Sequence, residues 1–306
     1  MVENELLPSW NDGAPKSAIL DFVRRVTTPG GGDFVPPRER IATFDNDGTL
    51  CCEQPLQMQF FFLFDRVKEF AGKDPALRER QPFKAVLEHD YSTLFSLGRQ
   101  ALLELVFATH AGITDEEFDQ LARGWLATAA HPTFGRLHKE CIYRPQLELL
   151  AYLRENDFKT YIVTGSGIDF IRAFADEVYG IPREQVIGSS AKLRYDVTGS
   201  GGVSLMKLPE LNSFDDREAK PLNIGLHIGR RPVLVFGNSD GDLPMIRYAK
   251  SGRGPRLALL LHHDDAQREA AYDREFRLSP LAEALDKAED YGITRVSMKR
   301  DWKKVF

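Results

Sequence analysis

Asp45 and Asp47 stand two residues apart, directly after the short apolar run Ile41–Phe44. Such a run is typical of a buried β-strand, and in a continuing strand the two carboxylates would share one face and repel each other. Gly48 follows them and indicates that the chain leaves the sheet here, although Asp and Gly also favour an ordinary turn. Two carboxylates this close are stable together when a hard cation lies between them or when one holds a proton. The spacing therefore predicts a metal or acid–base site at a strand end.

A second predicted strand ends in hydroxyl and glycine residues. The apolar run Thr160–Thr164 is followed by Gly165, which has no side chain to keep a ligand away from the backbone. A helix is predicted to begin near Asp169, and helix N-termini attract anions. Thr164 and Gly165 are therefore candidates for binding an anionic group, although glycine-rich turns between a strand and a helix are also common without any ligand.

A third strand, predicted over Val233–Phe236, is followed by a small acidic loop that holds Asn238, Asp240 and Asp242. Lys220 precedes this strand in the sequence. An isolated lysine is usually a solvated surface charge, so Lys220 becomes a candidate only through its position between two strands that end in polar loops.

Taken in order, these four segments resemble the four motifs of the haloacid dehalogenase superfamily. The resemblance implies that Asp45 is a nucleophile that attacks phosphorus and forms an aspartyl-phosphate. It implies that Asp47 is the general acid and base, which protonates the leaving alcohol and then activates water. Thr164 would donate to a phosphate oxygen, and Lys220 would neutralise charge on the phosphoryl group and on Asp45. Carboxylates are competent covalent nucleophiles, and a carboxyl in a crowded, charged site can have its pKa raised toward the working pH.

The superfamily usually shows Gly-Asp-x-x-x-Asp in its fourth motif, and this chain has Asn238 in place of the first Asp. The resemblance implies a Mg²⁺ ion bound by Asp45, by the backbone carbonyl of Asp47 and by the fourth-motif loop. An Asn carbonyl can bind Mg²⁺ but carries no charge. Asn238 is the expected metal ligand, and Asp240 is the alternative source of the missing carboxylate. Asp242 is expected to bind the ligands or waters of the ion without contacting the ion itself.

Within the superfamily the pattern is most similar to the phosphoserine-phosphatase-like branch, through Ala219-Lys220, the segment 181–188 and the form of the fourth motif. In that branch an acid shortly after the first motif binds the ammonium group of the substrate. Glu53 stands one residue away from that spacing. The candidate substrate-binding residues are therefore Glu53, Thr164, Gly165 and Lys220.

Residues 51–143 lie between the first and second motifs and show helical periodicity without a clear strand. Helices are predicted over Phe60–Phe70 and Tyr91–His110, and a third begins after Thr114, an N-cap with Glu117 at the capping-box position. An insertion at this point resembles the helical cap of the C1 class, which closes over the site, excludes water and selects the substrate. The aromatic run Phe60–Phe64 is expected to form the core of this cap. Candidates for a substrate carboxylate, against the alternative of solvated helix charge, are Arg66, Arg99 and Arg136.

Residues 1–50 and 144–306 are expected to form the core. Helices and strands alternate there, which predicts an α/β fold with a doubly wound, mostly parallel sheet, the Rossmann-like core of the superfamily, and a ligand site at the carboxyl ends of the strands. Residues 190–216 are predicted to be a loop or a hairpin that turns at Gly199–Gly202. The other predicted elements are helices over Lys16–Val26, Leu147–Glu155, Asp169–Tyr179 and Asn223–Ile228, and strands over Val186–Ser189 and Leu257–Leu261.

The composition of the chain argues against a nucleic-acid-binding protein and against a membrane-spanning one. The formal net charge of −5 over 306 residues gives no basic footprint for nucleic acid, and no apolar run is long enough to cross a membrane. The opening residues lack the features of a signal peptide, which predicts a cytoplasmic protein, although a periplasmic protein trimmed of its signal would look the same. Cys51, Cys52 and Cys141 are expected to be reduced thiols. His262–Asp265 is interpreted as a polar loop at a strand end and not as a metal cluster.

The expected function is that of a Mg²⁺-dependent phosphomonoesterase that hydrolyses a small phosphorylated metabolite through an aspartyl-phosphate on Asp45. A phosphomutase or phosphotransferase, in which an alcohol replaces water as the acceptor, is the alternative on the same scaffold. A non-catalytic binding protein is supported only by Asn238 and is opposed by the intact Asp45 and Asp47. The expected partner is a small phosphate monoester, without nucleic acid or membrane, and the oligomeric state is left open.

Overall fold

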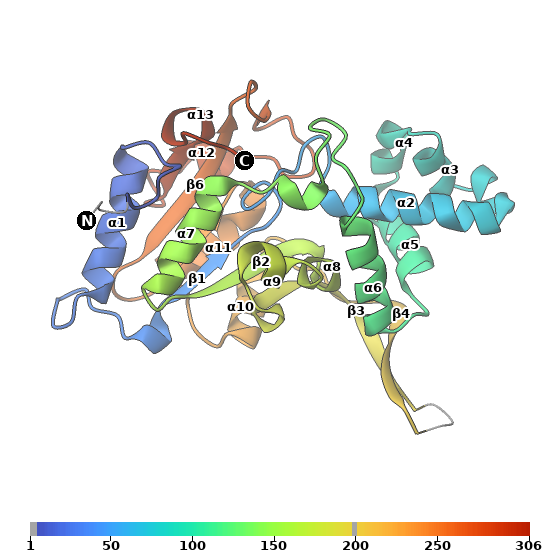
Figure 1. Cartoon of the computed structure of the whole chain (residues 1–306), viewed down its shortest axis with the longest axis horizontal. Coiled ribbons are helices and arrows are strands. Elements are labelled where there is room, and N and C mark those ends of the chain that lie inside the picture. Colours follow the sequence, from blue (N-terminus) through green and yellow to red (C-terminus); the bar gives the residue numbers. More distant parts are fainter. Residues whose placement is uncertain (1–4, 198–200) are drawn as a thin grey trace.

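The computed structural model describes residues 5–197 and 201–306. Its centre is an eight-stranded sheet with the order β4-β3-β2-β1-β5-β6-β7, and β8 pairs with β6. β4 and β7 are antiparallel to their neighbours and the other pairings are parallel, so the predicted fold class is confirmed (Figure 1). The strands are β1 (Ile41–Phe44), β2 (Lys159–Gly167), β3 (Val186–Val197), β4 (Val203–Ser213), β5 (Leu234–Gly237), β6 (Leu257–Asp264), β7 (Ala271–Tyr272) and β8 (Thr294–Ser297).

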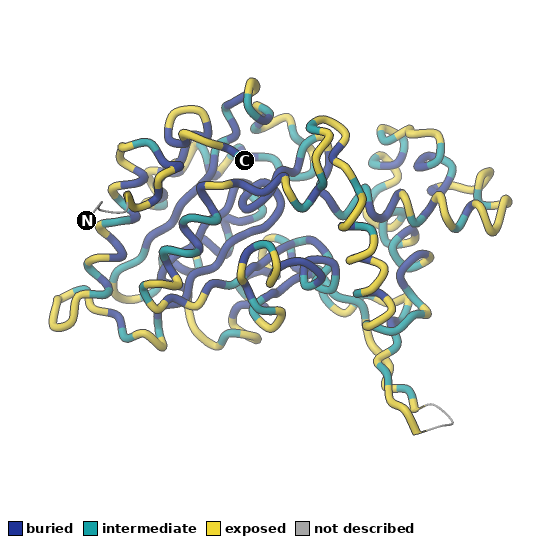
Figure 2. Tube along the Cα trace, in the orientation of Figure 1, coloured by how far each residue is buried: buried dark blue, intermediate teal, exposed yellow. Residues whose placement is uncertain are grey.

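Two apolar layers sandwich the sheet because successive residues of a strand point to opposite faces. Ile162 and Leu234 belong to one buried cluster, and their neighbours Val163 and Val235 belong to the other. The first face is covered by α1 (Ala14–Thr27), α7 (Arg144–Glu155), α8 (Ile168–Arg172), α9 (Ala175–Tyr179) and α13 (Met298–Asp301). The second face is covered by α10 (Ala219–His227), α11 (Leu243–Lys250) and α12 (Glu283–Asp286). Figure 2 shows the sheet as the most deeply buried part of the chain.

The segment between β1 and α7 is largely helical and lies beside the sheet (Figure 1). Its third predicted helix begins as expected, since Thr114 and Glu117 form a capping box at the start of α6. A separate apolar cluster that includes Leu63, Val67 and Leu105 holds much of this segment together. We call it the α2–α6 group; its members are α2 (Met58–Lys73), α3 (Phe83–Leu87), α4 (Tyr91–Ser96), α5 (Gly98–His110) and α6 (Asp115–Leu126).

The β3–β4 hairpin extends beyond the sheet and packs on the α2–α6 group (Figure 1). The backbone N–H of Gly112 donates to the carbonyl of Lys207 at 2.9 Å, and the N–H of Lys207 donates to the carbonyl of Ile113 at 2.9 Å. The sequence predicted a loop or a hairpin here without this docking. Of its predicted turn, Gly199–Gly202, residues 199 and 200 lie outside the described residues.

Two predicted helices are interrupted. The helix expected over Tyr91–His110 breaks between α4 and α5 at Gly98, whose φ of 78° is outside the helical range. The helix expected over Asp169–Tyr179 breaks at Phe174, whose φ of −135° does not continue the turn. Helical periodicity does not detect such breaks, because the buried faces on either side still point to the same core. Short 3₁₀ turns occur at Pro37–Glu39, Pro75–Glu79, His138–Glu140, Arg183–Gln185 and Asp240–Asp242.

The C-terminal segment packs on the core and adds a strand that the sequence did not predict. β8 runs parallel to β6, and Trp302 after it is buried against Trp10, with ring centroids 5.9 Å apart. Among the described helices, none is long and apolar enough to cross a membrane.

Candidate active site

The predicted polar residues meet at the carboxyl ends of β2, β1 and β5, which are neighbours in the sheet. Phe44 pairs with Ile162 on one side and with Phe236 on the other, so Asp45, Thr164 and Asn238 all follow at the same edge. The N–H of Asp45 donates to the carbonyl of Phe236 at 3.0 Å. Three strand ends that are far apart in the sequence therefore build one site, as an open α/β sheet requires.

Lys220 lies in the first turn of α10 and joins two carboxylates. Its Nζ donates to Asp45 Oδ1 and to Asp242 Oδ1, both at 2.6 Å. Burial alone would lower the pKa of Lys220, but the negative charges of Asp242 and Asp45 outweigh it and raise that pKa. Burial, with the charge of Asp242, raises the pKa of Asp45 well above its usual range in spite of Lys220. Lys220 thus carries a firm positive charge beside the candidate nucleophile.

Asp47 is held by two hydroxyl groups from the end of β2. Ser166 Oγ donates to Asp47 Oδ2 at 2.7 Å, and Thr164 Oγ1 donates to the same oxygen at 3.4 Å. Burial raises the pKa of Asp47, while the hydrogen bond from Ser166 opposes that rise. Ser166 was not among the predicted site residues. The signal for it was present, because Ser166 is two residues beyond Thr164 and therefore shares its face of the strand.

Thr164 and Gly165 take different places at this edge. The Thr164 hydroxyl is buried, and it also accepts the N–H of Ser166 at 3.1 Å. Gly165 and Ser166 line the cavity that opens from Asp47, whereas Thr164 is not part of its wall. The structure therefore brings Thr164 to Asp47, and it exposes Gly165 and Ser166 to a ligand.

Glu53 and Asn238 form a buried pair against the backbone of Gly48. Asn238 Nδ2 donates to Glu53 Oε1 at 2.8 Å, and Thr49 Oγ1 donates to Asn238 Oδ1 at 2.9 Å. Gly48 has a φ of 76°, and a Cβ built on it would lie 2.1 Å from Asn238 Nδ2 and 2.3 Å from Glu53 Oε1. No residue except glycine fits here, because both the backbone conformation and the space exclude a side chain.

The carboxylate of Glu53 is fully buried, and it does not line the cavity. It accepts hydrogen bonds from Tyr272 OH at 3.0 Å and from Ser279 Oγ at 2.9 Å, in addition to Asn238. The structure thus turns Glu53 toward Asn238 and away from the space in which a substrate ammonium group would lie.

The two aspartates of the acidic loop after β5 bond to different parts of the chain. Asp242 Oδ2 accepts the N–H groups of Asn238 at 2.9 Å and Ser239 at 3.1 Å, which fixes the loop. Asp240 points elsewhere: its carboxylate accepts the N–H groups of Ala282 and Ala284, the latter at 2.8 Å. The carboxylate of Asp240 is therefore engaged at the start of α12.

A second buried network supports the first-motif loop from behind. His263 Nε2 lies 2.7 Å from the carbonyl oxygen of Gly48, and His263 Nδ1 lies 3.1 Å from Glu269. Glu269 also accepts from Cys52 and from Tyr143 OH, each at 3.0 Å. Burial raises the pKa of Glu269, but His263 and these donors outweigh it and leave that pKa low. The stretch interpreted as a loop, His262–Asp265, lies mostly in β6, and within it His263 contacts the Gly48 backbone.

The three cysteines are buried free thiols, as expected.

The donor set of the site fits a hard cation. Asp45, Asp47, Glu53 and Asp242 are buried together with the single ammonium group of Lys220. Within the described residues no group of three or more His, Cys, Asp or Glu side chains is arranged to hold a metal ion. The expected site, however, uses one carboxylate, one amide and one backbone carbonyl. The carbonyl of Asp47 accepts no hydrogen bond from any described residue, so it is free to bind a cation.

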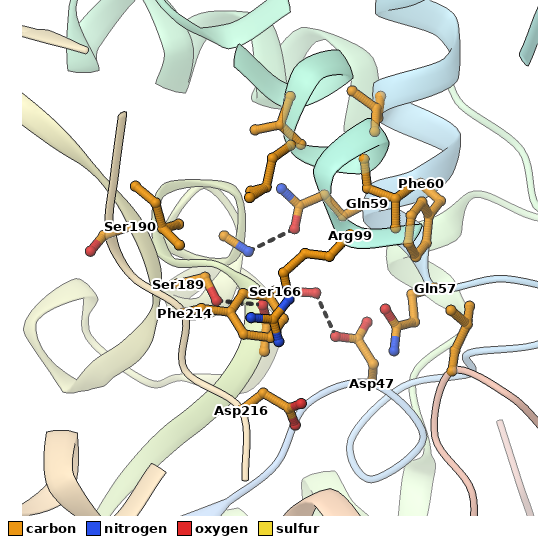
Figure 3. A pocket seen from close by; sticks show the side chains of 18 of the residues that line it. Asp47, Gln57, Gln59, Phe60, Arg99, Ser166, Ser189, Ser190, Phe214 and Asp216 are labelled. Atoms are coloured by element: carbon orange, nitrogen blue, oxygen red, sulfur yellow. Dashed lines mark hydrogen bonds between the residues drawn. The ribbon is translucent and has the colours of Figure 1, made fainter. Parts of the chain in front are cut away.

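A cavity of about 460 Å³ opens from Asp45, Asp47 and Lys220 and extends between the sheet edge, α5 and β4 (Figure 3). Of the three candidate arginines, Arg99 lines this cavity, and its guanidinium lies 4.1 Å from the ring centroid of Phe214. Arg66 pairs with Glu69, and Arg136 lies over Phe306, so neither reaches the cavity. Phe60 also lines the cavity, although the aromatic run that contains it was expected to be core only.

The model of one protein family, described as haloacid dehalogenase-like hydrolase, matches residues 42–247. No sequence among curated proteins matches the chain.

Solved structures resemble the chain at low sequence identity. A conserved protein of unknown function from Anaerococcus prevotii is 18% identical, with a TM-score of 0.52, over 81% of this chain and 85% of that one. A protein of unknown function from Bordetella pertussis is 15% identical, with a TM-score of 0.52, over 84% of this chain and 98% of that one. A phosphoserine phosphohydrolase-like protein from Francisella tularensis is 18% identical, with a TM-score of 0.41, over 82% and 98%.

Proposed function

This chain belongs to the haloacid dehalogenase-like hydrolase family, and we propose that it is a Mg²⁺-dependent phosphomonoesterase that forms an aspartyl-phosphate on Asp45. One observation carries the proposal. Asp45, Asp47 and Lys220 converge at one end of a single cavity, with Lys220 bonded to Asp45 and with hydroxyl groups bonded to Asp47. A nucleophile, an acid–base group and a fixed positive charge are the parts that phosphoryl transfer through a carboxylate needs.

The chemistry assigns a task to each side chain in turn. An oxygen of Asp45 attacks phosphorus, and the bond from phosphorus to the leaving oxygen breaks while the protonated Asp47 gives its proton to that oxygen. Asp47, now ionised, takes a proton from a water molecule as the water attacks the phosphorus of the aspartyl-phosphate. Inorganic phosphate leaves and Asp45 is restored. Lys220 offsets the negative charge that the phosphoryl group adds beside Asp45 and Asp242.

Asp45, the carbonyl of Asp47 and Asn238 are the proposed ligands of Mg²⁺, and the bound ion would neutralise charge on the phosphoryl group. The position of Asp240 at the start of α12 supports Asn238 over Asp240 as the ligand. Asp242 supports the site through the loop that it fixes. Residues 51–143 are proposed to act as a cap that closes over this site and selects the substrate.

A screen of phosphate monoesters with purified protein, with and without Mg²⁺, tests the function. We expect release of inorganic phosphate that needs Mg²⁺, stops with a chelator and is lost in Asp45→Asn. Transfer of the phosphoryl group to an added alcohol, or a requirement for a sugar-phosphate activator, would favour the phosphotransferase or phosphomutase. Binding of phosphate esters with no turnover under any of these conditions would favour a non-catalytic protein.

Ser166→Ala is expected to move the pH profile of kcat to higher pH. The lost hydroxyl stabilises the ionised form of Asp47, so its removal raises the pKa of Asp47 further. As the pH falls, Asp47 then becomes protonated, and stops acting as a base, at a higher pH than in the unmodified protein. As the pH rises, Asp47 keeps the proton that it needs as an acid up to a higher pH. Both limbs therefore shift in the same direction, as measured by the pH dependence of kcat on one alkyl phosphate.

Ser189→Ala is the matched control for this shift. Ser189 lines the same cavity, but its hydroxyl donates to the carbonyl of Gly165 at 2.7 Å and does not contact Asp47. We expect its profile to keep the pH limbs of the unmodified protein. A Ser166→Ala protein whose limbs also stay in place would show that Ser166 does not set the protonation of Asp47.

Asn238→Asp is expected to destabilise the fold unless Glu53 is replaced at the same time. The substitution replaces the NH₂ group that donates to Glu53 with an oxygen, so two buried carboxylates would face each other where a 2.8 Å hydrogen bond existed. We expect a loss of about 2 kcal/mol in the free energy of unfolding. Adding Glu53→Gln supplies a donor again and should restore stability, with Mg²⁺ affinity, measured by calorimetry, at least as high as in the unmodified protein. Full stability of Asn238→Asp alone would contradict this pairing.

A further inference from the structure

We propose that the natural substrate is a phosphate monoester of an apolar alcohol, aliphatic or aromatic, and not of an amino acid. This inference rests on the proposed phosphomonoesterase function and names the substrate class of the same site. It follows from the juxtaposition, in one cavity, of Asp45 and Asp47 with an apolar wall from α5 and β4.

The wall is built from apolar side chains that the protein core does not use. Leu103 and Phe107 of α5 lie one turn apart, and Leu208 and Leu211 of β4, with Phe214 just beyond it, also line the cavity. All five are only partly buried, and none belongs to the three apolar clusters of the described residues. Arg99 lies over the ring of Phe214, but the other four side chains belong to no apolar cluster in the described part of the chain, and contact with an apolar ligand would remove their surface from water.

Most of the carboxylates near the cavity that could bind the ammonium group of an amino-acid substrate are already engaged. Glu53 is turned toward Asn238 and Tyr272, away from the cavity. Lys207 lines the cavity but is paired with Asp169. The lining carboxylate that has no ion pair or catalytic assignment among the described residues is Asp216. A substrate with an ammonium group would have to use Asp216, so such substrates belong in the test.

Arg99 brings a positive charge to the cavity from α5. It extends toward the end of the cavity that holds Ser166 and Asp47 (Figure 3). Its guanidinium lies over the ring of Phe214, and no described carboxylate forms an ion pair with it. Arg99 therefore adds a positive charge to the one that Lys220 supplies beside Asp45, and the apolar wall is the surface left to contact the alcohol part of the ester. A cavity of about 460 Å³ is also much larger than a serine side chain needs.

The test is a series of straight-chain phosphates, ethyl, butyl and hexyl, assayed with the full chain and Mg²⁺ beside phosphoserine and phosphoethanolamine. The leaving alcohols of the series are chemically alike, so differences in kcat/KM report binding of the chain in the transition state. We expect kcat/KM to rise about fourfold per methylene, or about 250-fold over the four methylenes from ethyl to hexyl, since each buried methylene contributes about that factor. Phosphoserine and phosphoethanolamine should fall at or below ethyl phosphate.

Two variants test whether the dependence of kcat/KM on chain length arises from the apolar wall. Leu103→Gln and Leu211→Gln should each lower the ratio of hexyl to ethyl kcat/KM about tenfold, because a polar amide replaces apolar surface in the cavity. Leu121→Gln is the matched control: Leu121 lies on α6 with its side chain at the surface, outside the cavity. We expect that control to keep the ratio of the unmodified protein. Urea unfolding of each variant checks that the fold is retained.

The outcomes distinguish failure of the apolar substrate class from failure of the phosphomonoesterase function. If phosphate esters are hydrolysed but kcat/KM does not depend on chain length, or if phosphoserine exceeds hexyl phosphate, the apolar substrate class is overturned and the phosphomonoesterase stands. A hexyl-to-ethyl ratio that survives both wall substitutions would also overturn it. If no ester is hydrolysed, including an activated aryl phosphate, the proposed function fails and this inference fails with it.

Discussion

Asp45→Asn is expected to lower kcat by about 10³-fold or more on every phosphate ester, because an amide cannot form the covalent intermediate. The asparagine side chain has the same size and keeps one oxygen that can accept from Lys220, whose other partner, Asp242, is unchanged. The expected loss is therefore in kcat and not in folding. Steady-state kinetics, combined with urea unfolding of the variant, measure the two separately.

Asp176→Asn is the control for this variant. Asp176 lies in α9 with an exposed side chain that takes part in no ion pair within the described chain. We expect it to keep the activity of the unmodified protein. Near-normal turnover in Asp45→Asn would rule out the aspartyl-phosphate route, and water would then have to attack phosphorus directly.

Asp47→Asn is expected to produce a loss that depends on the leaving group. The amide oxygen of the new side chain can still accept the hydrogen bond from Ser166, so the geometry should be kept while the transferable proton is removed. Alkyl phosphates need that proton on the departing oxygen and should lose about 10²- to 10⁴-fold in kcat/KM. An activated aryl phosphate has a leaving group that departs without a proton, so its kcat/KM should fall much less.

The effect is measured by dividing kcat/KM for an alkyl phosphate by kcat/KM for an aryl phosphate, in Asp47→Asn and in the unmodified protein, and comparing the two ratios. The ratio does not depend on the fraction of active enzyme in either preparation. Equal losses on the two substrates would indicate that Asp47 holds the loop in place and does not act as an acid.

The positions of Asp45, Thr164 and Asn238 could be predicted because each lies at the end of a strand, whereas Lys220, in the first turn of α10, was a candidate only through its place between two strands that end in polar loops. In a mostly parallel sheet, polar residues that follow neighbouring strands must meet at one edge, and the register of β1 with β2 and β5 places them there. The assignment of their chemical roles came from the family resemblance. Those roles, and the division of the chain into a core and a cap, remain predictions.

The surroundings of Glu53 could not be predicted. Its carboxylate is oriented by Tyr272 and Ser279, which lie 219 and 226 positions away, and by the space that Gly48 leaves open. The docking of the β3–β4 hairpin on the α2–α6 group depends on contacts of the same long range. Local periodicity carries no information about such contacts, and so the apolar wall of the cavity became visible only when α5 and β4 were brought together.

The most direct test of the function is to trap the aspartyl-phosphate. Asp47→Asn protein is mixed with a radiolabelled aryl phosphate and quenched in acid, and the labelled peptide is mapped by mass spectrometry. In this variant the intermediate should form, because the aryl group leaves unaided, and should then accumulate, because water is no longer activated. We predict label on the peptide that contains Asp45, and none when Asp45 is also replaced by asparagine. Turnover of the aryl phosphate without any label on Asp45 would contradict the proposed function.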